Sequence, residues 1–265
     1  MLFTQVDPNG FIDTDRSLPA NGRGAWNRNG IGFDYRYAIN PDGQPRIGSQ
    51  ADKSMAHWAV AAGCYIIQSR LITLGHMGPL SDGEKGLFGE RTLAGVKAFQ
   101  AVNKDPDGGA QLVTDGTVGR SDARALFTPI LNAAERKYDI PNHYLRGECN
   151  HESMLDPGAV GYYIYYPDYR GVDRGAFQIN SKSAPDVTWA QAFDATFAAD
   201  WSAKRMRTNH DTYAARWPNQ DDTVLWHAAI LSHNNPSAAA IMARTGYPPY
   251  ETSAAYINNV LLAIY

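Results

Sequence analysis

The chain has 265 residues, of which 44% are hydrophobic, so it can bury a core in one large domain or in two modest ones. Its 24 Lys and Arg residues nearly balance 27 Asp and Glu residues, and the net charge of −3 argues against a generally basic surface for nucleic acid. The two cysteines are too few for a disulfide scaffold, and no segment has the roughly 18 consecutive apolar residues of a membrane span. We therefore expect no nucleic-acid partner, no membrane insertion and no cofactor, with Cys64 and Cys149 packing as small apolar groups.

Residues 1–50 form a loop-rich N-terminal segment whose role the sequence does not indicate. Turn-forming residues recur every few positions, as in DPNG, PANGRG, NRNG and NPDG, and they predict loops with short strands. The first fifteen residues, MLFTQVDPNGFIDTD, show no charged leader before an apolar run, so we expect no signal peptide here.

Residues 51–128 have the pattern of a small helical module. Apolar residues at helical spacing predict a helix from His57 to Leu74, which Gly75 is well placed to end, and a second helix at about 91–103. DGTVG then leads into a short third helix. The two Asp-Gly turns, each before a helix, form a weak internal duplication.

This segment resembles the peptidoglycan-binding domain type 1 family over residues 57–127. The motifs that carry the resemblance are Ile67-Gln68, Leu74-Gly75, Asp82-Gly83 with Phe88-Gly89 and Thr92, Ala98-Phe99-Gln100, and Asp115-Gly116 with Val118-Gly119. The chain departs from the family in a longer first turn, GEK, and in having Ser121-Asp122 where the family continues to Thr. The resemblance implies a three-helix module that binds peptidoglycan; a helical packing domain that binds nothing is the alternative.

After Thr128-Pro129, predicted as a cap and a first helical residue, the chain is expected to be mostly helical to residue 265. The helix at about 142–153 places Glu152 on one stripe with Leu145 and Cys149, and Glu148 nearer the edge of that stripe. Burial and the negative end of the helix dipole should both raise the pKa of Glu152. A carboxyl that stays protonated near neutral pH is suited to general acid catalysis.

Residues 129–265 resemble the lysozyme-like superfamily of soluble lytic transglycosylases and goose-type lysozymes. The shared motifs are Glu152-Ser153, Asp156-Pro157 with Ala159, Gly175-Ala176-Phe177-Gln178-Ile179, His233-Asn234-Asn235-Pro236 and Tyr256-Ile257. The resemblance implies an α+β domain with a short β-hairpin region, in which Glu152 is the catalytic acid. It also implies that Ser153 supports this acid and that Gln178, Asn234 and Tyr256 bind substrate.

Two departures from the family bear on the reaction outcome. The insert GYYIYYPDYRGVDR lengthens the interval between Glu152 and Gln178, and HNNP replaces Tyr-Asn-Ala-Gly. Water could therefore trap the intermediate, or the sugar's own hydroxyl could give an anhydro end. An inverting hydrolase needs a second carboxylate, for which Asp168 and Asp173 are candidates; both are also typical turn-forming residues.

Aromatic and histidine residues give weaker signals. The insert contains Tyr162 and Tyr163, which we predict to bind sugar by stacking, although hairpin packing explains the tyrosine cluster equally well. The histidines lack the His-x-x-x-His spacing of a metal site, and no Gly-x-Ser-x-Gly motif supports a serine nucleophile.

The sequence thus predicts a mainly α protein: residues 1–50, a wall-binding module at 51–128, and a lysozyme-like catalytic domain at 129–265. The expected partner is bacterial peptidoglycan, with no protein partner, and the expected reaction is cleavage between N-acetylmuramic acid and N-acetylglucosamine. The pairing of modules resembles bacteriophage endolysins and tail-associated lysins, made in the host cytoplasm and reaching the wall through a holin or from a virion. The alternative is an inactive wall-binding or virion structural protein.

Overall fold

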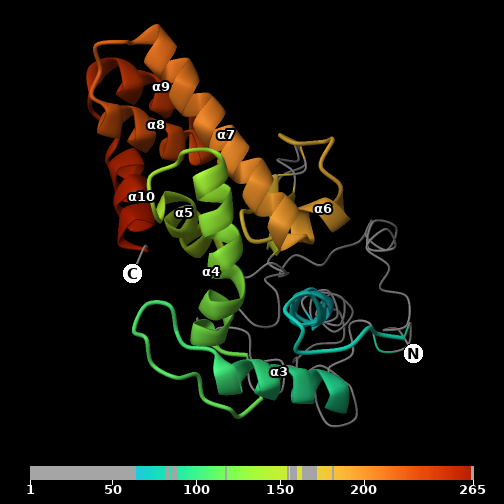
Figure 1. The fold of residues 1–265 in the computed structure, drawn as a ribbon. Coiled ribbons are helices and arrows are strands. Elements are labelled where there is room, and N and C mark those ends of the chain that lie inside the picture. Colours follow the sequence, from blue (N-terminus) through green and yellow to red (C-terminus); the bar gives the residue numbers. More distant parts are fainter. Residues whose placement is uncertain are drawn as a thin grey trace. The chain divides into compact units, whose positions relative to one another are not determined.

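The computed structural model describes residues 64–81, 84, 89–116, 118–153, 155, 160–162, 172–180 and 182–263. Within these residues the chain is mainly helical, which confirms the predicted class (Figure 1). None of the described helices is both long and apolar enough to cross a membrane. The expectations for residues 1–50 lie outside the described residues.

The chain divides into two compact units. One contains Met1–Thr128 and Ser153–Ala198, and the other contains Pro129–Glu152 and Ala199–Tyr265. The break between residues 128 and 129 coincides with the predicted domain boundary, but Ser153–Ala198 is grouped with the first unit instead of the second. The division follows contacts in space, whereas the sequence prediction followed chain order.

Three described helices overlap residues 51–128, and the third is longer than the short helix that the sequence predicted. They are a helix described over residues 64–73, α3 (Glu90–Val102) and α4 (Arg120–Lys137), of which α4 continues into the second unit. Leu71, Val96 and Phe99 are buried in the first unit, as the helical spacing predicted, whereas Leu74 is exposed and Ile67 is buried in addition. The prediction for Pro129 was wrong, because this residue lies inside α4. A proline inside a helix removes one amide donor but does not prevent the helix from continuing when packing holds both sides.

Two buried glutamines connect this unit internally. The Gln68 side-chain amide donates to Thr92 Oγ1 (2.8 Å) and to the Glu84 carbonyl (2.9 Å). The Gln100 side-chain amide donates to Asp122 Oδ1 (3.0 Å) and accepts from the Gly116 amide (2.8 Å). Asp122 therefore accepts from the second glutamine as Thr92 does from the first.

Replacing Gln100 with Leu is expected to lower the free energy of unfolding of the first unit by about 1–3 kcal/mol. The substitution leaves the Gly116 amide and the Asp122 carboxylate without their partner in a buried site. Urea unfolding followed by circular dichroism measures the loss. The control is Lys97→Leu, which replaces an exposed residue on the same helix and should leave the free energy of unfolding nearly unchanged.

A short antiparallel sheet in the first unit agrees with the predicted hairpin region. Its strands are β1 (Val160–Tyr162), β2 (Val172–Arg174) and β3 (Ile179–Asn180), in that order. Gly175 begins the turn between β2 and β3 with φ of 71°, and α6 (Trp189–Phe193) is the next element after β3. The buried Arg174 guanidinium donates to the carbonyls of Ile179, Ala184 and Val187, so it ties the segment after the sheet to β2.

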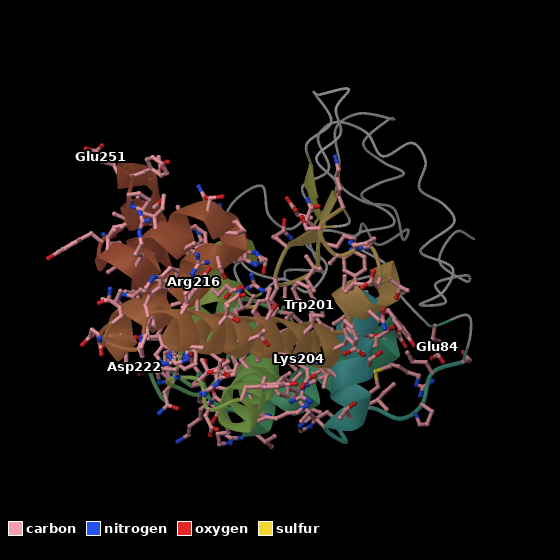
Figure 2. The ribbon with its side chains drawn as sticks, turned by 90° about the horizontal axis from the view of Figure 1, so that it is seen from above. Glu84, Trp201, Lys204, Arg216, Asp222 and Glu251 are labelled. Atoms are coloured by element: carbon pink, nitrogen blue, oxygen red, sulfur yellow. The ribbon has the colours of Figure 1, made fainter. Side chains whose placement is uncertain are left out.

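The second unit is built from helices. They are most of α5 (Tyr144–Ser153), most of α7 (Ala195–Arg216), α8 (Asp222–Asn234), α9 (Pro236–Thr245) and α10 (Glu251–Leu262). Helices α8 and α9 lie against each other, joined by Asn235, whose side chain accepts from the Ala238 amide (3.0 Å) (Figure 1). Buried alanines on α7, α8 and α9, such as Ala203, Ala229 and Ala239, permit close approach of these helices. Figure 2 shows the charged side chains Lys204 and Arg216 along α7.

Candidate active site

The helix that carries Glu152 is fixed at its start by a buried carboxylate. Glu135 of α4 accepts hydrogen bonds from the backbone amides of His143 (3.0 Å) and Leu145 (2.9 Å), which are unpaired donors at the beginning of α5. Burial raises the pKa of Glu135, while these amides act in the opposite direction. The start of α5 is therefore set by this contact with α4 as well as by the helix propensity of its own residues.

Glu152 lies at the last turn of α5 and is mostly covered. Only 16% of its side chain is exposed, and its Oε1 accepts a hydrogen bond of 2.6 Å from the Tyr256 hydroxyl of α10. Burial and the nearby carboxylates raise the pKa of Tyr256 far above its usual range, so the phenol keeps its proton and is the donor. The structure thus brings together Glu152 and Tyr256, two of the predicted site residues. The raised pKa expected for Glu152 stays a prediction.

Three further side chains lie behind Glu152. Glu148, one turn earlier on α5, is completely buried and forms an ion pair with Arg205 of α7. His233 of α8 lies between the two carboxylates: its Nδ1 is 3.3 Å from Glu148 Oε1, and its Nε2 is 3.7 Å from Glu152 Oε1. We call Glu148, Arg205 and His233 the buried cluster.

The electrostatics of the buried cluster follow from its burial. Desolvation raises the pKa of Glu148, against the opposing effect of the Arg205 guanidinium. Burial lowers the pKa of His233 well below its usual value, and the Arg205 charge acts in the same direction, so the imidazole is neutral. His151 is also near, since its ring meets that of Tyr256 edge-on at 5.0 Å. The site can therefore hold one proton-donating carboxyl beside a phenol donor and a neutral imidazole.

No protein-family model and no curated protein matches this sequence.

The other predicted residues have different placements. Ser153 is buried and its hydroxyl donates to the Ala176 carbonyl (2.7 Å), within the first unit. The side-chain amide of Gln178 donates to the Gly175 carbonyl (2.9 Å). The Gln178 backbone has φ of 48°, a left-handed conformation that costs a residue with a Cβ about 1–2 kcal/mol. Asn234 is exposed at the end of α8, whereas the side chain of His233 in the same HNNP motif is only 11% exposed.

The candidates for a second carboxylate and for sugar stacking are only partly described. Asp173 belongs to β2 and not to a turn; its carboxylate accepts from the Asn180 side chain (2.8 Å), and burial raises its pKa. Tyr162 pairs with Val172 through its backbone. The Tyr162 side chain, Tyr163 and Asp168 lie outside the described residues. In the described part of the chain, no three His, Cys, Asp or Glu side chains are grouped as metal ligands would be.

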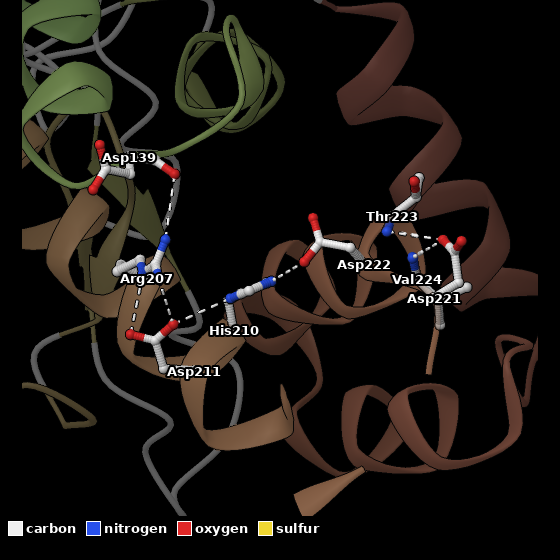
Figure 3. A network of polar contacts seen from close by, with 8 residues as sticks. All are labelled: Asp139, Arg207, His210, Asp211, Asp221, Asp222, Thr223 and Val224. Atoms are coloured by element: carbon white, nitrogen blue, oxygen red, sulfur yellow. Dashed lines mark hydrogen bonds and ion pairs between the residues drawn. The ribbon is translucent and has the colours of Figure 1, made fainter. Parts of the chain in front are cut away.

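A second polar network joins α7 to the start of α8 (Figure 3). His210 lies between Asp222 (Nε2–Oδ1 2.9 Å) and Asp211 (Nδ1–Oδ1 3.2 Å), and Arg207 pairs with Asp211. The His210 ring stacks on Trp226 with centroids 4.0 Å apart. Both carboxylates are largely exposed, so this network is a surface contact between two helices.

Sequence reasoning missed the buried cluster, although one signal was present. Glu148 and Glu152 are four residues apart and so share a helix face. The helical projection placed Glu148 near the edge of the apolar stripe, yet Glu148 is the more buried of the two. The reason is that α7 and α8 supply Arg205 and His233 over this edge, which the spacing within one helix does not reveal.

Proposed function

We propose that this protein degrades peptidoglycan by cleaving the bond between N-acetylmuramic acid and N-acetylglucosamine, with Glu152 as general acid. The observation that supports this proposal is the setting of Glu152: a carboxyl at a helix end, mostly covered yet still reached by solvent, with one oxygen held by the Tyr256 phenol. Such a carboxyl has both the restricted position and the access that proton donation to a leaving sugar oxygen requires.

The chemistry assigns a role to Tyr256 as well. When Glu152 gives its proton to the glycosidic oxygen, it becomes a carboxylate, and the Tyr256 hydroxyl already donates to its Oε1. Hydrogen bonds to an ionised acceptor are stronger than neutral ones, so this contact favours the transition state for proton transfer over the starting acid. Tyr256 is thus proposed to position Glu152 and to stabilise the charge it acquires.

Tyr256→Phe is expected to slow wall cleavage by roughly 10- to 100-fold, because removing a hydrogen bond to a charged group costs about 1.5–3 kcal/mol. Initial rates of turbidity loss of purified cell walls measure the effect. Tyr247→Phe is the control, since Tyr247 is 77% exposed. An unchanged rate for Tyr256→Phe, in a variant that melts like the parent chain, would show that the phenol only packs.

The module with the Gln68 and Gln100 motifs is proposed to anchor the protein to the wall. Both glutamines are fully buried and bonded inside the module, so they build it and do not contact a ligand. Binding to an insoluble polymer through one module raises the effective concentration of substrate at the other. This supports action at the bacterial wall, as in the lysins that the sequence resembles.

The test of the proposed function is the identity of the released products. Purified walls incubated with the full chain are expected to clear and to release muropeptides. Mass analysis of these fragments tells reducing ends from anhydro ends, which differ by one water, and so decides between a muramidase and a lytic transglycosylase. A protein that sediments with walls but releases no fragments would instead be the inactive wall-binding protein.

A further inference from the structure

The buried cluster contains polar atoms that have no hydrogen-bond partner among the described residues. These atoms are Glu148 Oε2, His233 Nδ1 and Arg205 Nε. Buried polar groups are rarely left unpaired, because each costs about 1–3 kcal/mol, and such groups are often functional where they persist. One of these atoms is in the His233 imidazole, and the other two belong to Glu148 and Arg205 of the same cluster. Their lack of partners, directly behind the proposed acid, needs a physical explanation.

The protonation of His233 is decided by its neighbours. A neutral imidazole carries a proton on one nitrogen and a lone pair on the other. Nδ1 lies 3.3 Å from Glu148 Oε1. Burial raises the pKa of Glu148, but the permanent charge of Arg205 in direct contact with this carboxylate opposes that effect and favours the ionised form, which can only accept. A small rotation of either side chain completes an Nδ1–H···Glu148 hydrogen bond. The lone pair is then on Nε2, the nitrogen 3.7 Å from Glu152.

We propose that Glu148, held by Arg205, fixes His233 in the tautomer protonated on Nδ1, so that the unprotonated Nε2 faces Glu152 and favours its acid form. This inference deepens the proposed function, on which its consequence for catalysis rests. Glu148 and His233 are positioning residues, since both act through Glu152.

The tautomer matters because it changes the sign of the effect on Glu152. A nitrogen lone pair opposite Oε1 disfavours a carboxylate anion, whereas an N–H at the same place would donate to that anion and stabilise it. The other titratable and charged groups around His233 are Glu148 and His151 on α5, Arg205 on α7 and Tyr256 on α10. Tyr256 donates to Glu152 and so favours its ionisation, whereas the imidazole lone pair and the Glu148 carboxylate both oppose it.

The tautomer can be measured directly on the full chain. Long-range proton–nitrogen NMR correlation of the histidine rings tells a protonated ring nitrogen from an unprotonated one. We expect His233 to show a protonated Nδ1 and an unprotonated Nε2 at neutral pH. The opposite tautomer, or a doubly protonated ring, would overturn the proposal without any need for a variant.

A variant tests the consequence for Glu152. His233→Gln replaces the lone pair with a side-chain amide that can donate to Glu152, so the pKa of Glu152, followed by carboxyl carbon NMR, is expected to fall by about one unit. His227→Gln, on the same helix, should leave it in place. The alkaline limb of the wall-clearing pH profile should move down with His233→Gln by the same amount. An unmoved Glu152 titration in folded His233→Gln would reject the coupling.

Glu148→Gln provides a second, independent variant. Its neutral amide can donate to Nδ1, so His233 is expected to shift its proton to Nε2; retention of the Nδ1 proton would show that Glu148 does not set the tautomer. The NMR readouts do not depend on wall cleavage. Failure of the parent chain to clear walls therefore rejects the proposed function alone, and the wrong tautomer in a chain that clears walls rejects this inference alone.

Discussion

Glu152→Gln is expected to reduce cleavage of purified walls by roughly 10²- to 10⁴-fold, the range that general acid catalysis contributes. Glutamine has nearly the same shape and its side-chain carbonyl can still accept from the Tyr256 hydroxyl, which is 2.6 Å from Glu152 Oε1 in the parent chain. What it lacks is a proton that it can give to the leaving oxygen. The loss should therefore appear in the rate of fragment release and not in the thermal unfolding of the protein.

The matched control for this experiment is Glu251→Gln. Glu251 is an exposed glutamate at the start of α10 (Figure 2), and its replacement by glutamine removes the same charge. We expect it to clear walls at the parent rate. Equal clearing by Glu152→Gln and the parent would reject Glu152 as the acid. If neither protein cleared walls although both sedimented with them, the wall-binding alternative would hold.

The parts of the fold that depend on local pattern could be predicted from the sequence. The helix expected at about 91–103 is observed at Glu90–Val102, because Val96 and Phe99 repeat at the helical period and are buried. The link between Glu152 and Tyr256 came from the family resemblance, not from spacing, because 104 residues separate them. The buried cysteines were also expected.

The parts that depend on packing between distant helices could not be predicted. Each member of the buried cluster has an ordinary local reading: Glu148 as a helix residue near a polar edge, Arg205 as a surface cation of a long helix, and His233 as part of a helix end. Their roles arise only because α5, α7 and α8 meet in one unit. Likewise, Asn234 was singled out, whereas its neighbours His233 and Asn235 make the contacts seen here.

Gly175→Ala is expected to destabilise the first unit by about 2–5 kcal/mol, the sum of left-handed strain and of overpacking. Gly175 has φ of 71°, and a Cβ built at this position would lie 1.9 Å from the Ala192 carbonyl oxygen. The obstacle is backbone, which cannot rotate away as a side chain can. Either the turn between β2 and β3 or helix α6 must therefore move, and with it the Gln178 backbone, which donates to the Gly175 carbonyl (3.0 Å).

Gly109→Ala separates the two contributions to this loss. Gly109 also has a positive φ, 64°, but nothing lies within 4 Å of the place where its Cβ would stand. It should lose only the strain, about 1–2 kcal/mol, whereas Gly175→Ala should lose the strain and the space. Chemical unfolding of both variants measures the difference. Equal losses would mean that the turn relaxes away from Ala192 at no cost, and hence that the close packing of this turn against α6 does not hold the Gly-Ala-Phe-Gln motif in place.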